Sequence, residues 1–289
     1  MTMLMALAIP SKRVDSHQHF WRYSEAEFGW IDNAMAGIRR DFLPSDLKPL
    51  LDQSEVGATV AVQARQSLEE TEWLLSLAAE SPWIAGVVGW VPLVQPEVSS
   101  TLEELASNKR LKGVRHVLQA EPDEYMERAG FNSGLRALRK FDLAYDLLVL
   151  EHQLPAAIAL VDRHPDQRFV LDHLAKPRIA AHELEPWLSN IRRLAEREHV
   201  SCKLSGMVTE ASFERWKPGD LLPYAEAVLE GFGPNRLMFG SDWPVCTVAS
   251  RYSRWVDTVL DFLGGLSESE ENQIMASNAV EFYRLRTTH

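Results

Sequence analysis

Eight short apolar runs, separated by stretches of helical pattern, constrain this chain more than any other feature. The runs are rich in β-branched residues, as buried parallel strands are, and they lie at 13–18, 57–64, 84–91, 111–118, 144–150, 168–174, 200–206 and 236–242. Strands that alternate with helices form a parallel sheet. Eight such units favour closure of that sheet, so we predict an α/β protein with the fold of a (β/α)8 TIM barrel. The usual length range of this fold includes 289 residues.

The segments between the runs fit this architecture. Helical pattern covers 67–79, 97–108, 132–141, 154–163, 183–198 and 221–232, and Ser267 with Glu270 has the capping-box spacing that begins a terminal helix. The long segment 20–56 is predicted to be an insertion over the barrel mouth, with a helix near 44–54. We expect residues 1–289 to form one domain, of which 1–12 are a loose N-terminal extension.

Charge and cysteine content narrow the class of function. The net charge of -11 and the pI near 5.3 argue against nucleic acid and anionic membrane as partners, since both select basic surfaces. Two cysteines cannot build a disulfide framework, which predicts a cytoplasmic protein. The apolar start of the chain precedes Lys12 and Arg13, whereas a signal peptide carries its positive charge first. The sequence leaves the oligomeric state open.

Ionisable residues stand at the ends of the first and last strands. His17 and His19 are two positions apart and therefore point the same way, either as ligands of one metal ion or as two donors to one carbonyl. The alternative is a pair of satisfied polar residues in a loop. Asp242 follows the eighth strand, which neighbours the first in a closed barrel, so it should lie beside both histidines. It would accept a proton from water or bind a metal, or else cap the next helix.

Further candidates follow strands five and six. His173 ends the sixth strand and should reach the barrel axis, unless it is a hydrogen-bonded core histidine. Its neighbour Asp172 should point away, because side chains alternate along a strand. His152 follows the fifth strand by two residues and is either a ligand, a substrate contact or an ordinary loop residue.

Other side chains are candidates for substrate contacts. Arg65, Arg115 and Lys203 are either clamps for substrate oxygens or halves of structural ion pairs, since a buried unpaired cation is costly. Ser205 shares a strand face with Lys203 and has the same two alternatives. Trp30 and Trp243 follow predicted strands, at the mouth of the barrel, where aromatic faces could pack against a sugar.

With these residues in place, the chain resembles the amidohydrolase superfamily, amidohydrolase-2 type. The resemblance runs from VDSHQHFW through GVRH, LDHLAKP, KLSG and LMFGSDWPV to SNAVEFYRL. It is strongest to the sugar-lactonase branch, which includes L-fuconolactone and L-rhamnonolactone hydrolases and is related to 2-pyrone-4,6-dicarboxylate lactonase. The resemblance implies a (β/α)8 barrel that hydrolyses a cyclic ester. By motif, His17 and His19 match the strand-one pair, His173 the strand-six histidine and Asp242 the strand-eight aspartate.

The chain departs from many superfamily members on the fourth strand, where Arg115 and His116 replace the lysine that bridges two metals. This argues against a binuclear centre. Branch members resembling this chain can work without metal, so no required cofactor is the favoured expectation. The alternative is one zinc ion on His17, His19 and Asp242. Acidic residues at 121, 123 and 124 favour a neutral sugar lactone over the pyrone dicarboxylate.

We therefore predict hydrolysis of an aldonolactone, such as L-fuconolactone, L-rhamnonolactone or L-galactonolactone, to the sugar acid in carbohydrate catabolism. Asp242 is the predicted general base, and the three histidines are the electrophiles. Predicted substrate contacts are Arg65, Arg115, His152, Lys203, Ser205, Trp30 and Trp243. The alternatives are a metal-dependent decarboxylase of the same superfamily, which His152 supports, a pyrone-dicarboxylate lactonase, and a non-catalytic binding barrel. The sequence does not decide the sugar or its ring size.

Overall fold

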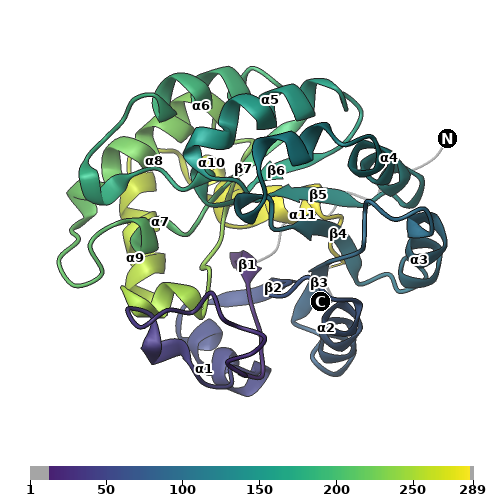
Figure 1. Cartoon of the computed structure of the whole chain (residues 1–289). Helices are drawn as coiled ribbons and strands as arrows, with labels where there is room; N and C mark the ends of the chain where they lie inside the picture. Colours follow the sequence, from purple (N-terminus) through teal and green to yellow (C-terminus); the bar gives the residue numbers. More distant parts are fainter. Residues whose placement is uncertain (1–12, 287–289) are drawn as a thin grey trace, which may run out of the picture.

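A computed structural model describes residues 13–286, and it contains one parallel sheet of eight strands in sequence order. The loose extension expected for 1–12 lies outside the described residues. Figure 1 shows the strands as a ring enclosed by helices. The strands are β1 (Arg13–Gln18), β2 (Val56–Val62), β3 (Ile84–Gly89), β4 (Leu111–His116), β5 (Ala144–Leu147), β6 (Phe169–Leu171), β7 (Val200–Leu204) and β8 (Leu237–Phe239). The predicted (β/α)8 barrel is confirmed, whereas the extent of the domain over all 289 residues stays a prediction.

The ring closes at the carboxyl ends of β1 and β8. Gln18 forms a parallel bridge with Trp243, and the Asp242 amide donates to the His17 carbonyl at 2.8 Å. Gly240 permits this approach, because a Cβ there would lie 2.8 Å from the Cβ of His17. The residues of the first and last strands that carry chemistry are thus hydrogen-bonded neighbours.

The helices surround the ring (Figure 1). They are α1 (Pro44–Gln53), α2 (Leu68–Glu80), α3 (Val98–Leu105), α4 (Ala129–Leu138), α5 (Leu154–Asp162), α6 (Trp187–Ala195), α7 (Met207–Glu210), α8 (Pro218–Phe232), α9 (Tyr252–Leu263), α10 (Glu268–Asn272) and α11 (Asn278–Phe282). The capping box of Ser267 and Glu270 is present at α10. Helix α9 is absent from the sequence prediction, although it has a buried apolar face formed by Tyr252, Trp255, Val256 and Val259.

Two features of the fold place the site. The segment between β1 and α1 has little regular structure, and an antiparallel bridge between Trp21 and Phe42 folds it back on itself. At the other end, α11 and the turn before it pack against β1 and β8, burying Ala279, Val280 and Tyr283. Within residues 13–286, no helix combines the length and the apolarity needed to cross a membrane.

Candidate active site

A cavity of about 570 Å³ opens at the carboxyl ends of the strands. His19, His173 and Asp242 line it, together with residues of the segment after β1, of which Trp30 is 44% exposed. In a (β/α)8 barrel this face carries the active site. A cavity of this size is typical of a small-molecule site.

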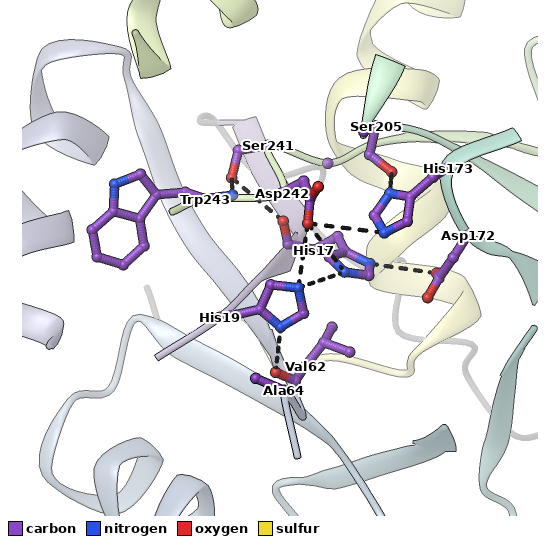
Figure 2. A network of polar contacts seen from close by, with 12 residues as sticks. His17, His19, Val62, Ala64, Asp172, His173, Ser205, Ser241, Asp242 and Trp243 are labelled. Atoms are coloured by element: carbon purple, nitrogen blue, oxygen red, sulfur yellow. Dashed lines mark hydrogen bonds and ion pairs between the residues drawn. The ribbon is translucent and has the colours of Figure 1, made fainter. Parts of the chain in front are cut away.

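Three imidazoles and one carboxylate converge at the cavity (Figure 2). Nε2 of His17 lies 3.1 Å from Nε2 of His19 and 3.8 Å from Oδ1 of Asp242. The same carboxylate oxygen is 3.3 Å from Nε2 of His19 and 3.8 Å from Nε2 of His173. Residues at or just after the carboxyl ends of β1, β6 and β8 therefore face one point.

The backbone after β6 turns two consecutive side chains toward this point. The strand ends at Leu171, and His173 and Leu174 adopt φ of 52° and 55°, in the left-handed region. Asp172 consequently lies beside His17, with Oδ1 3.4 Å from Nδ1, instead of pointing away. The prediction for Asp172 was wrong because alternation applies only while the strand continues.

The outer nitrogen of each histidine is held by a different partner. Nδ1 of His19 donates to the Val62 carbonyl at 2.8 Å. Nδ1 of His173 lies 2.9 Å from Oγ of Ser205. Nδ1 of His17 faces the buried ammonium of Lys203 at 3.0 Å. Such outer contacts fix the ring orientation and the position of the proton.

Burial and neighbouring charges set the protonation states. Burial lowers the pKa of His173 to about 4. Burial and the adjacent Lys203 hold the pKa of His17 well below its ordinary value, so both rings are neutral near pH 7. Burial alone would raise the pKa of Asp242, but His173 and the hydrogen bond with His19 hold it below its usual range. The carboxylate is therefore ionised and can accept a proton.

The donor set fits a single zinc ion. Tetrahedral zinc with bonds of about 2.0–2.1 Å places its ligand atoms roughly 3.3–3.4 Å apart. The four spacings here run from 3.1 to 3.8 Å. His17, His173 and Asp242 have ligand atoms all within 4.8 Å of one another. The trio that the sequence predicted, His17, His19 and Asp242, is also close, with spacings of 3.1, 3.8 and 3.3 Å.

The structure divides the predicted substrate contacts into two groups. Arg65, Arg115 and Trp30 line the cavity. His152, Lys203, Ser205 and Trp243 are not among the lining residues, which differs from the prediction.

The surroundings of each of these four residues explain why it does not line the cavity. His152 is exposed in the turn before α5. Lys203 is fully buried in the barrel, and Ser205 is engaged by His173. Trp243 is 2% exposed and packs its ring against Phe20 and Phe42.

Every cation that lines the cavity is paired with a carboxylate. Arg65 contacts Glu27, Arg115 contacts Asp172 at 3.0 Å, and Lys176 lies 3.6 Å from Glu210. Sequence reasoning missed Glu27, Lys176 and Glu210. Lys176 belongs to the LDHLAKP motif, but nothing in the sequence pairs it with a residue of α7.

Comparisons with known proteins give consistent results. A family model described as amidohydrolase matches residues 14–285. An L-fucono-1,5-lactonase of Burkholderia multivorans is 41% identical over 291 residues, covering 94% of this chain and 96% of the relative. Another L-fucono-1,5-lactonase, from Burkholderia ambifaria, is 37% identical over 284 residues, with the same coverage of both. An L-rhamnono-gamma-lactonase of Scheffersomyces stipitis is 22% identical over 200 residues, covering 61% of this chain and 59% of the relative.

A crystal structure of an amidohydrolase from Burkholderia multivorans with bound zinc superposes with a TM-score of 0.93 at 40% identity, covering 96% of this chain and 100% of that one. A crystal structure of a probable 2-pyrone-4,6-dicarboxylic acid hydrolase from Acinetobacter baumannii gives a TM-score of 0.78 at 16% identity, covering 95% of this chain and 100% of that one. The latter likeness shows the fold alone.

Proposed function

The chain belongs to the amidohydrolase family, and from this premise we propose that it hydrolyses a sugar lactone to the corresponding sugar acid. The observation that carries the proposal is the ionised Asp242 among three imidazoles at one end of the cavity. The relatives named L-fucono-1,5-lactonase and L-rhamnono-gamma-lactonase support a cyclic sugar ester as substrate. L-Fucono-1,5-lactone is the first substrate to test.

The residues supply each proton that the reaction needs. The Asp242 carboxylate takes a proton from water, and the resulting hydroxide attacks the lactone carbonyl carbon. The carbonyl oxygen becomes an oxyanion, which donors fixed around the cavity stabilise. As the ring carbon–oxygen bond breaks, protonated Asp242 returns its proton to the leaving alkoxide. One water is consumed, and the product is a hydroxy acid whose carboxyl proton passes to solvent.

The same residues would hold one zinc ion through His17, His173 and Asp242, with His19 adjacent. When bound, zinc lowers the pKa of a water and polarises a carbonyl. The sequence favoured hydrolysis without metal. The grouping of these ligand atoms, and the zinc in the similar crystal structure, favour the zinc alternative.

Charge pairing in the cavity favours a neutral substrate. A dicarboxylate needs free cations, whereas Arg65, Arg115 and Lys176 each face a carboxylate of this chain. The pyrone-dicarboxylate alternative is weakened accordingly. The decarboxylase alternative rested on His152, which is exposed and does not line the cavity.

The remaining proposals concern partners and location. A small sugar lactone is the partner that the cavity supports. We place the protein in the cytoplasm, because Cys202 and Cys246 are both buried free thiols and reducing compartments keep thiols in this form.

The test is acid release from a panel of aldonolactones and a pyrone dicarboxylate, followed with a pH indicator, with and without chelator. We expect rapid hydrolysis of a neutral lactone, loss of rate with chelator, and recovery with zinc. Asp242→Asn should keep the fold and nearly abolish turnover. Full rate in this variant would refute the mechanism, and carbon dioxide release without lactone hydrolysis would establish the decarboxylase.

A further inference from the structure

A lysine is buried in the barrel interior, behind the histidine cluster. Lys203 is fully buried, and its Nζ lies 2.5 Å from Oδ2 of Asp146, 3.0 Å from Oδ1 of Asp172 and 3.0 Å from Nδ1 of His17. Tyr283, just after α11, donates to the same Asp146 carboxylate at 2.8 Å. A buried ammonium is tolerated only when it is paired, and the two carboxylates provide this. The contact with His17 is additional to that pairing.

The direction of this contact determines where the His17 proton lies. An ammonium has donors only, so Nδ1 of His17 accepts and the neutral ring carries its proton on Nε2. The Arg115 guanidinium also approaches Nε2 of His17, and a hydrogen bond from it would require a lone pair on that nitrogen. This contact is 3.4 Å long, whereas the Lys203 contact is 3.0 Å, so the Lys203 contact is the stronger of the two.

A second group faces the same nitrogen with the opposite preference. Oδ1 of Asp172 lies 3.4 Å from Nδ1 of His17 and 3.0 Å from the Lys203 ammonium, and among the described residues it makes a hydrogen bond with neither. Oδ2 of the same carboxylate is anchored by Arg115 at 3.0 Å. Buried polar atoms without a partner are rare. Oδ1 is therefore positioned to accept a hydrogen bond from a proton on Nδ1 of His17. When the His17 proton is on Nε2, this hydrogen bond cannot form.

A metal ion at the site requires that proton. His17 binds a cation through Nε2 only with a lone pair there, which moves the ring proton to Nδ1, where Asp172 accepts it. We propose that Lys203 and Asp172 compete for Nδ1 of His17 and thereby set how tightly the site holds a divalent cation. Lys203 opposes binding, and Asp172 promotes it. The inference rests on the proposed metal site and makes both residues positioning residues.

Two pairs of proteins with matched charge test the competition. Asp146→Asn/Lys203→Met removes one anion and one cation, so its buried cluster has the same net charge as that of the wild type. Asp172→Asn and Asp146→Asn each remove one buried carboxylate. Of the two carboxylates, Asp172 is the one with an ion-pair contact to Nδ1 of His17, at 3.4 Å. Zinc dissociation constants are measured by competition with a fluorescent chelator, on protein first stripped of metal.

We expect the double variant to bind zinc at least about tenfold more tightly than the wild type. We expect Asp172→Asn to bind it at least about tenfold more weakly than Asp146→Asn. A general loss of packing would weaken binding in all variants, so opposite signs identify the competition. Equal constants within either pair, or a reversed order, would overturn the proposal.

Nitrogen-15 spectra of histidine-labelled, metal-free protein read the proton position without zinc or turnover. We expect the His17 proton on Nε2 in the wild type and on Nδ1 in the double variant. A wild-type proton on Nδ1 overturns the inference. Lactone hydrolysis is assayed separately on the wild type, so failure of the proposed function is distinguishable from failure of this competition.

Discussion

Replacing Gly206 with alanine should disable the site while leaving the barrel folded. Gly206 follows β7 with φ of 65°, and a Cβ there would lie 2.6 Å from both Cγ and Nδ1 of His173. Ordinary contact begins at 3.4 Å. The imidazole must therefore retreat by about 0.8 Å, and a misplacement near 1 Å can cost on the order of 10² in rate. We expect kcat to fall about a hundredfold.

Gly233→Ala is the matched control. Gly233 has φ of 68° at the end of α8, and a Cβ there meets only the side-chain oxygen of Asn235, at 3.0 Å. Gly206, with ψ of 4°, carries the left-handed penalty of about 1–2 kcal/mol. Gly233, with ψ of 167°, lies in a region that is essentially reserved for glycine, where a side chain costs about 1–3 kcal/mol. At roughly 2 °C per kcal/mol for a domain of this size, each should lose a few degrees of Tm. Only Gly206→Ala should lose activity.

The assay combines scanning calorimetry with the pH-indicator assay on the best lactone. Gly206→Ala with kcat within twofold of Gly233→Ala would show that His173 tolerates displacement, and the role given to it would be wrong. Unfolding of Gly206→Ala at assay temperature would contradict the estimated penalty.

Three further outcomes follow from single contacts. Trp30→Ala should raise KM about tenfold with Tm unchanged within about 1 °C, because the ring lines the cavity and is 44% exposed; an unchanged KM would place the substrate elsewhere. Ser205→Ala should lower kcat about tenfold by removing the partner of Nδ1 of His173, and a normal kcat would show that this contact is dispensable. Burial raises the pKa of Glu70 to about 7, from 4.5, so the folded state binds the proton more tightly and loses stability as pH rises between these values. The unfolding free energy of the wild type minus that of Glu70→Gln should fall over this window in urea titrations and stay level above it; a constant difference would refute the shift.

Much of the site was predictable because a closed barrel has a fixed topology. The eight strands follow from the repeated pattern, and closure alone brings Asp242 beside His17 and His19. The predictions that were wrong depend on features that strand periodicity does not encode. Periodicity gave the Asp172 side chain the wrong direction, because β6 ends at Leu171 and the backbone at His173 and Leu174 is in the left-handed region.

The alternation of side chains along a strand also does not show how deep in the barrel a side chain lies. Lys203 faces inward as its strand position suggests, but it ends on Asp146 and His17 instead of in the cavity. Trp243 follows β8 at the mouth, but the aromatic rings of the segment after β1 enclose it. The partners of both residues are distant in sequence and become visible only in three dimensions.

The contact from Tyr283 to Asp146 has a consequence for how the protein is made. Tyr283 is among the last described residues, and its hydroxyl reaches the carboxylate that neutralises Lys203 behind His17. A ribosome-bound chain that has emerged only through Asp242 holds every side chain of the catalytic cluster and still lacks this contact. Synthesis must therefore run past Tyr283 before the buried charges are fully bonded, and a chain released between Asp242 and Tyr283 would keep its histidines but lose that support.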